Sequence, residues 1–241
     1  MSLASPRLPL FAAVLAVGAL ALVGCSASPG ASTPTSTPEQ TDTAASGDAN
    51  AAHAAWLDGG RMIAVVTEGS STCVPMANDV TAEGQTVKVV LADPTGSPCT
   101  KDLVPRATAI GVPEGLDVSK DVEIEITYGE ADLTAGLAGL AAGAAAPGSA
   151  TDYQPSAGWF SDTGVVLLTW GSSTCVPQLQ DVAETDGGAK VTFAEPKADQ
   201  ACTLDMAPRA TLIELPTKHE AGKDFTLTLT GDNIEGTVQV L

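Results

Sequence analysis

The sequence predicts an all-β protein of two tandem modules, each a small β-sandwich or β-barrel with one disulfide, behind a disordered tether. The main observation is an internal repeat. Residues 69–75 (Gly-Ser-Ser-Thr-Cys-Val-Pro) return as residues 171–177, and residues 105–108 (Pro-Arg-Ala-Thr) return as residues 208–211. A repeat at a steady offset indicates two copies of one structural unit. Segments of strand type and a Ser/Thr/Pro-rich segment complete the prediction.

The first 24 residues have the pattern of an export signal. Arg7 precedes an apolar run over residues 8–22. At about 15 residues this run is short for a membrane span of roughly 20 and typical of a signal peptide. It ends in Leu22-Val23-Gly24-Cys25, which resembles the lipobox of bacterial lipoproteins. The resemblance implies cleavage before Cys25, a diacylglyceryl thioether on its sulfur, and a fatty acyl group such as palmitate on the new N-terminus.

The lipid implies a location. Two or three acyl chains hold a protein durably on a bilayer, since each buried methylene contributes about 0.8 kcal/mol. We therefore expect an extracytoplasmic protein anchored to the cell membrane through Cys25.

Two segments lack the pattern of a packed element. Residues 25–52 are rich in Ser, Thr, Pro, Ala and Gly. They are expected to form a disordered tether, because they cannot bury enough apolar surface to offset chain entropy. Residues 138–156 are rich in Ala and Gly and contain Pro147-Gly148, which indicates an interdomain linker. The two modules then occupy residues 53–137 and 157–241.

Short apolar segments of strand type recur in both modules. They pair as residues 62–67 with 165–169, 86–91 with 189–193, 107–112 with 210–215, and 122–127 with 225–230. The last pair alternates apolar and polar residues, which places one face of a strand in a core and the other in water. Each module is expected to hold about five to seven short strands, a spacing that fits a sandwich and a barrel equally.

The chain is acidic, with 29 Asp and Glu against 11 Lys and Arg and a formal net charge of −18. Such a charge argues against a nucleic-acid partner and against a basic patch on anionic lipid. We interpret the charge as a solubility feature. Attraction of cations or basic partners is the alternative.

Four cysteines remain besides Cys25, two in each module. They allow three connectivities, and the repeat selects Cys73–Cys99 and Cys175–Cys202. An exported location permits their oxidation. Each bridge would close a loop of about 27 residues and contribute about 3–3.5 kcal/mol through loop entropy. No Cys-x-x-Cys motif is present, and a redox or catalytic role is disfavoured.

No catalytic residue, metal site or cofactor is predicted. The two histidines, His53 and His219, are not repeated between the modules. A serine triad on Ser71 or Ser173 would therefore lack its base in at least one copy. With the cysteines paired and the histidines scattered, a zinc site lacks ligands.

The tryptophans offer a weaker signal. Trp56 and Trp159 occupy equivalent positions in the repeat and are predicted to fill the two cores, with a sugar-stacking platform as the alternative. Trp170 corresponds to Glu68 in the first module, so it is a candidate for a difference between the modules.

The repeated Gly-Ser-Ser-Thr-Cys-Val-Pro segment is the first candidate for a contact site. Its Gly, Ser and Pro residues favour a bend after a strand, and its hydroxyls can bond turn amides. A disulfide-pinned loop can also bind a partner, since scaffolded loops commonly carry function. The candidate binding residues are Ser70, Ser71, Thr72, Ser172, Ser173 and Thr174.

Repeated charged residues form the second candidate. They are Asp79, Asp102 and Arg106 in the first module and Asp181, Asp205 and Arg209 in the second. A partly buried arginine needs carboxylate or carbonyl partners. The favoured interpretation is an internal clamp, in which Arg106 pairs with Asp102 or Asp79 and holds the disulfide loop. An anion- or carboxylate-binding site is the alternative.

Beyond the leader, the modules are similar to those of uncharacterised actinobacterial lipoproteins, through the Ser-Ser-x-Cys and Pro-Arg-Ala-Thr segments. That resemblance implies no reaction, cofactor or ligand. We expect a membrane-anchored, non-enzymatic protein that binds an unknown envelope protein or small ligand, and no nucleic acid. A secreted-peptidase inhibitor and an enzyme or accessory subunit are the alternatives, and the oligomeric state is left open.

Overall fold

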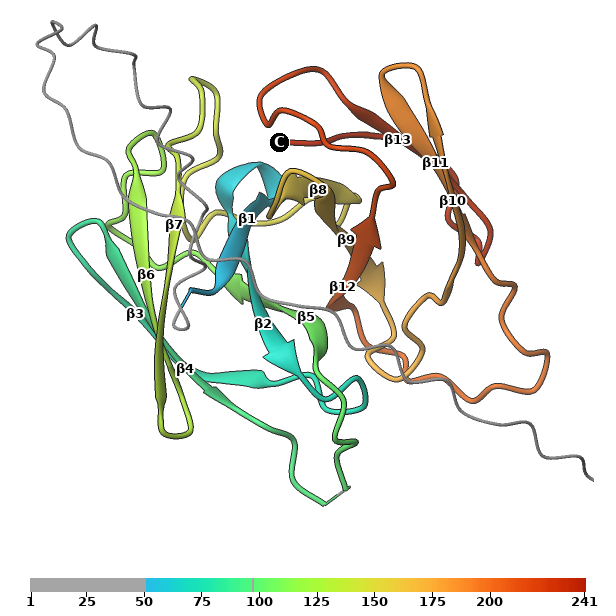
Figure 1. The fold of residues 1–241 in the computed structure, drawn as a ribbon, viewed down its shortest axis with the longest axis horizontal. Helices are drawn as coiled ribbons and strands as arrows, with labels where there is room; N and C mark the ends of the chain where they lie inside the picture. The colour runs from blue at the N-terminus through green and yellow to red at the C-terminus, as the bar shows by residue number, and fades with distance from the viewer. Residues whose placement is uncertain (1–50, 97) are drawn as a thin grey trace, which may run out of the picture. The chain divides into compact units, whose positions relative to one another are not determined.

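The computed structural model describes residues 51–96 and 98–241 (Figure 1). Cys25, the leader and most of the predicted tether lie outside the described residues. The described chain is built of short β-strands with a single 3-10 turn, η1 (Asp58–Gly60). This confirms the predicted all-β class. Within this part of the chain, no helix has the length and apolar character needed to cross a bilayer.

The first module consists of two sheets. Strands β1 (His53–Leu57), β2 (Met62–Gly69) and β5 (Val104–Gly111) form an antiparallel sheet in the order β1-β2-β5. Strands β3 (Met76–Glu83), β4 (Thr86–Ala92), β6 (Val122–Tyr128) and β7 (Ala131–Leu137) form the other sheet in chain order. In this second sheet β4 and β6 run parallel, and the remaining pairs are antiparallel.

The second module repeats this topology strand for strand. Strands β8 (Ser156–Trp159), β9 (Gly164–Gly171) and β12 (Ala207–Glu214) form the three-stranded sheet. Strands β10 (Leu179–Thr185), β11 (Gly188–Phe193), β13 (Thr226–Thr230) and β14 (Gly236–Gln239) form the four-stranded one, with β11 and β13 parallel. Each module thus has two separate sheets, so the sandwich is the observed form of the two predicted alternatives.

Each sandwich encloses its own core. In the first module, Ile63 and Val65 of β2 pack with Val87, Val89 and the apolar residues of β6. The alternation in β6 was the clearest strand signal, and its apolar residues are buried while Glu123 and Glu125 face solvent. Trp56 and Trp159 belong to the two cores and are 5% and 8% exposed.

A third apolar cluster joins the two modules. The faces of the three-stranded sheets that point away from the module cores share this cluster, which contains Ala64 and Val66 of β2 and Val166 and Leu168 of β9. Strands β1 and β8 are in contact across this interface, as are β5 and β12. The approach is close, because a Cβ atom on Gly158 would lie 2.1 Å from the carbonyl oxygen of Trp56.

The segment expected as a linker packs on the first module. Its Ala138 carbonyl accepts a hydrogen bond from Nε1 of Trp56 at 2.8 Å, and its Leu140 side chain lies against the core. Ala145 N–H donates to the carbonyl of Gly59 at 2.8 Å. Residues 138–156 therefore cover one end of the first sandwich as they lead to the second.

Candidate functional site

Each repeated motif forms a loop that leaves the central strand of a three-stranded sheet, β2 or β9. A disulfide ties the loop to the segment that precedes β5 or β12. Cys73 pairs with Cys99 at a Cα–Cα distance of 5.5 Å, and Cys175 pairs with Cys202 at 5.6 Å. Both predicted pairings are confirmed.

A hydroxyl network fixes the first loop from within. Asp102 accepts hydrogen bonds from Ser71 N–H at 3.2 Å and from the Thr100 hydroxyl. Thr100 also donates its N–H to Thr72 Oγ1 at 3.1 Å, and its hydroxyl lies 2.8 Å from that of Ser70. These bonds satisfy the turn amides that the motif leaves free of strand partners. The hydroxyls of this candidate binding loop therefore serve its own conformation.

The second loop repeats the network. Asp205 accepts hydrogen bonds from Ser173 N–H at 3.1 Å and from the Thr203 hydroxyl. Thr203 N–H donates to Thr174 Oγ1 at 3.1 Å, and the Thr203 and Ser172 hydroxyls lie 2.8 Å apart. Thr100 and Thr203 are the hubs of the two networks. Their place in the repeated Cys-Thr-x-Asp segment was the signal for them, although the sequence did not assign them a role.

These hydrogen bonds lower the pKa values of the Asp102 and Asp205 carboxyl groups. Those from Ser71 and Thr100 lower the pKa of Asp102 to about 2. Those from Thr203 and Ser173 lower the pKa of Asp205 to about 2 as well. Both groups are thus ionised at neutral pH, because donors aimed at a carboxylate favour its charged form.

The repeated arginines do act on the loops, but through partners other than those the sequence suggested. Arg106 is 4% exposed and donates from Nη1 to the carbonyl of Cys73 at 2.6 Å and from Nη2 to that of Glu68 at 3.1 Å. Its further contacts are the Tyr128 hydroxyl at 3.2 Å and Asp93 at 3.8 Å. Two backbone carbonyls and Asp93 are thus the partners of Arg106, in place of the expected Asp102 or Asp79.

The second arginine has the same carbonyl partners and fewer others. Arg209 donates to the carbonyls of Cys175 and Trp170, both at 2.9 Å. Burial lowers the pKa of its guanidinium. Asp79 and Asp181 lie beyond irregularities in β3 and β10 and are exposed. Among the described residues, neither forms an ion pair with an arginine.

The two loops come together at one cleft between the modules. The cleft has a volume of about 580 Å³ and is lined by equivalent residues of both copies. Ser71, Val74 and Arg106 line it from the first module, and the matching residues Ser173, Val176 and Arg209 line it from the second. The structure thus unites both sequence candidates, the loops and the arginines, at a single place.

Exposed apolar side chains lie on the loops of both modules. Val74, Met76 and Val176 line the cleft, and the others lie close in sequence to Cys99, Cys175 or Cys202. Leu103 is 75% exposed and Leu204 is fully exposed. We call the whole set the loop-end surface, and its members are Val74, Met76, Leu103, Val176, Leu179, Leu204 and Met206. A concentration of large apolar side chains in solvent is typical of an interaction site. Sequence reasoning missed most of these residues, although apolar residues close to a cysteine in the sequence were a signal for them.

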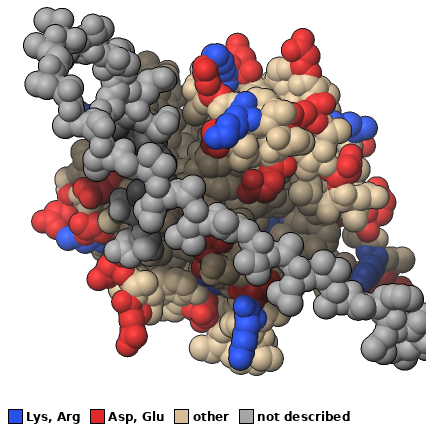
Figure 2. All heavy atoms as spheres, viewed as in Figure 1, with Lys and Arg blue, Asp and Glu red and all other residues tan. Residues whose placement is uncertain are grey.

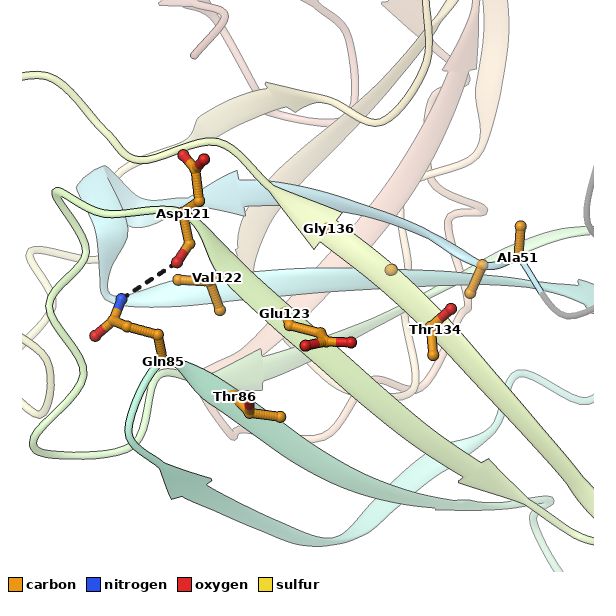
Figure 3. Close-up of a pocket in the computed structure, with 10 residues that line it drawn as sticks. Ala51, Gln85, Thr86, Asp121, Val122, Glu123, Thr134 and Gly136 are labelled. Carbon is orange, nitrogen blue, oxygen red and sulfur yellow. Dashed lines mark hydrogen bonds between the residues drawn. The ribbon is translucent and has the colours of Figure 1, made fainter. Parts of the chain in front are cut away.

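A hollow on the first module and the acidic surface are weaker candidates for a functional site. A hollow of about 600 Å³ on the first module is lined by Gln85, Glu123 and Thr134, and the Gln85 side chain donates to the Asp121 carbonyl at 3.4 Å (Figure 3). The second module has Gly187 and Thr226 at the places of Gln85 and Glu123. Asp and Glu side chains are spread over the face shown in Figure 2. In the described residues no three potential ligands converge on a metal position.

The serine hydroxyls of the two loops have hydroxyl partners. Those of Ser71 and Ser173 lie 3.4 Å from those of Thr100 and Thr203. The loop-end surface can bury apolar area and present two rigid loops. Comparison of the chain with models of protein families, with curated proteins and with solved structures finds no match.

Proposed function

We propose that the mature protein is a lipid-anchored, extracytoplasmic binding protein that holds a partner protein of the cell envelope at its loop-end surface. The observation that carries the proposal is that both copies of the most strongly repeated motif line one cleft, together with the exposed apolar side chains of Val74, Met76 and Val176. A duplicated loop that served only its own module would not require this convergence.

Rigidity of the loops supports a binding role. A disulfide, a hydroxyl network and an arginine hold each loop. Loops fixed in advance lose little conformational entropy when a partner binds, and this raises affinity for a given buried area. The exposed leucines and methionines then supply the apolar area, which gains free energy at about 25 cal/mol per Å² removed from water.

Anchoring supports an envelope partner. The lipobox-like segment that ends at Cys25 would place the acylated N-terminus in the membrane, and the residues up to 52 would separate it from the modules. The two disulfides are compatible with an oxidising compartment outside the cytoplasm. Replacement Cys25→Ala is expected to release the protein from the membrane fraction or to leave an unprocessed precursor. Unchanged membrane partition with an unmodified N-terminus would contradict the anchor.

Site-specific photo-crosslinking in intact cells tests the surface itself. A photoreactive amino acid at position 103 or 204 is expected to give a discrete crosslinked product with an envelope protein. The matched control is position 90, because Val90 is an apolar residue of β4 that is 40% exposed and does not line the cleft. Equal crosslinking at positions 103 and 90, or none at 103 and 204, would contradict the proposed surface. If the crosslinked partner were a peptidase and the purified protein inhibited it, the protein would instead be an inhibitor.

A further inference from the structure

A second and larger cleft lies between the modules, at the edge of the three-stranded sheets formed by β1 and β8. The loop cleft, in contrast, is lined by β5 and β12. The volume of the β1–β8 cleft is about 970 Å³. Ligand sites in proteins commonly enclose about 300–1,000 Å³, so this cleft has room for one medium-sized molecule. We call it the tryptophan cleft, and its principal lining residues are Trp56, Leu137, Leu140, Trp159, Phe160 and Val240.

The walls of this cleft are mostly apolar. Aromatic and aliphatic side chains from both modules form two of its sides. The alanine- and glycine-rich residues 138–144 form another, and their small side chains leave the space open. A segment that the sequence suggests to be a linker thus also shapes the cleft.

The two tryptophans differ in their hydrogen bonding. Trp56 donates its indole N–H to the Ala138 carbonyl at 2.8 Å. Trp159 is 8% exposed, and its indole Nε1 has no acceptor among the described residues. A buried donor without a partner is unfavourable. The equivalent indole donor is therefore paired in the first module and buried without a partner in the second.

The charges at the rim restrict the ligand further. Each cation there already has an acidic partner: Lys223 lies 2.5 Å from Glu220, and Lys218 lies 2.7 Å from Asp162. His219 stacks on Trp159 and lies 3.1 Å from Glu184. Asp224, which lines the cleft, has no cationic partner within the described residues. The rim therefore offers no free cation to an anionic group and has acid in excess.

We propose that the tryptophan cleft binds a medium-sized apolar molecule whose polar end is uncharged or cationic. Apolar walls enclose the body of the molecule, and the acidic rim disfavours an anionic end. This binding site is separate from the loop-end surface, and it does not depend on the partner protein proposed above.

Three fluorescent probes with one apolar body test the proposal: diphenylhexatriene, its trimethylammonium derivative and its propionic acid derivative. Each would be titrated into the purified chain from residue 26 onward, which lacks the apolar run of residues 8–22 and keeps the whole folded unit of residues 46–241. We expect probe emission to rise with excitation of tryptophan, because the bound probe would lie beside Trp56 and Trp159. The cationic and neutral probes are expected to bind at least tenfold more tightly than the anionic one. No gain in emission for any probe would overturn the site, and tightest binding of the anionic probe would overturn the charge assignment.

Two variants locate the probe and test the rim. Ala142→Phe fills the cleft and is expected to weaken binding at least tenfold, whereas the control Ala131→Phe, on an exposed position of β7 outside the cleft, should leave it unchanged. Asp224→Asn should reduce the preference for the cationic probe over the neutral one. All three positions are exposed, so the variants are expected to fold. Loss of binding in Leu103→Asp, or equal binding in Ala142→Phe and Ala131→Phe, would contradict a site in this cleft.

Discussion

The guanidinium of Arg106 lies in the space that a side chain on Gly69 would need. A Cβ atom on Gly69 would be 2.4 Å from Nη2 of Arg106, and one on Gly171 would be 2.9 Å from Cζ of Arg209. The glycine that opens each loop motif and the arginine of the Pro-Arg-Ala-Thr segment are thus parts of one contact. This explains why two motifs far apart in sequence repeat together.

Replacement Gly69→Ala is expected to destabilise the protein. The methyl group would force the guanidinium away from the carbonyls of Glu68 and Cys73, and overpacking of this kind costs about 1–3 kcal/mol. Urea unfolding followed by tryptophan fluorescence measures the loss. Gly111→Ala is the control, because Gly111 also ends a strand of this sheet but has nothing within 4 Å of its Cβ position. A smaller effect of Gly69→Ala than of Gly111→Ala would contradict the contact.

Replacement of Arg106 is expected to reduce the stability of the protein more than replacement of Arg209. Arg106→Leu removes the donors to two carbonyls, to Tyr128 and to Asp93, and buried acceptors left unpaired cost about 1–3 kcal/mol each. Arg209→Leu should cost less, because Arg209 bonds two carbonyls and is more exposed. Thermal unfolding of the two variants checks the order. If crosslinking at position 103 failed in Arg106→Leu while stability was unchanged, the arginine would be a binding residue and the clamp would be wrong.

The disulfide pairing, the positions of four strands in each module and the role of the arginines as clamps could be predicted from the sequence, because each depends on local pattern or on the repeat. The remaining three strands of each module were not located. The hydrogen-bond partners of Arg106 could not be predicted from the sequence. A backbone carbonyl carries no sequence signature, whereas Asp102 stood out as a repeated charge. The convergence of the loops also escaped prediction, because it depends on how the two modules pack.

The sequence contains a pattern that fits the packing of the modules on each other. Residues 62–66 and 165–168 are continuously apolar, while β6 alternates. A strand that is buried on both faces has no need of polar residues on either. The second buried face belongs to the cluster shared by the modules. It contains Ala64 and Val66 of β2 and Val166 and Leu168 of β9. A continuous run was consistent with a strand of a small sandwich, so the pattern alone did not reveal the interface.

The loop carboxylates give the protein an acid-sensitive element. The pKa of Asp102 in the folded state is about 2, below its usual value of 3.8. Its contribution to stability is therefore complete above pH 3.8 and is lost as the pH falls toward 2. Thermal midpoints measured from pH 6 to pH 2 should show a gap between the parent and Asp102→Asn that closes over this window. Asp79→Asn is the control for removal of one surface charge. A gap that widened on acidification would contradict the assigned hydrogen bonds.

The interface between the modules leads to a direct comparison of two adjacent residues. Leu167 and Leu168 of β9 are both 0% exposed, but Leu167 lies in the core of the second module and Leu168 in the cluster shared with the first. Because both side chains are enclosed, Leu167→Ala and Leu168→Ala should each cost about 2–5 kcal/mol. Urea unfolding should remain a single transition in the parent protein, since the shared cluster couples the modules. If Leu168→Ala left stability within about 0.5 kcal/mol, as expected of a surface site, or if the parent unfolded in two steps, the modules would behave as independent domains.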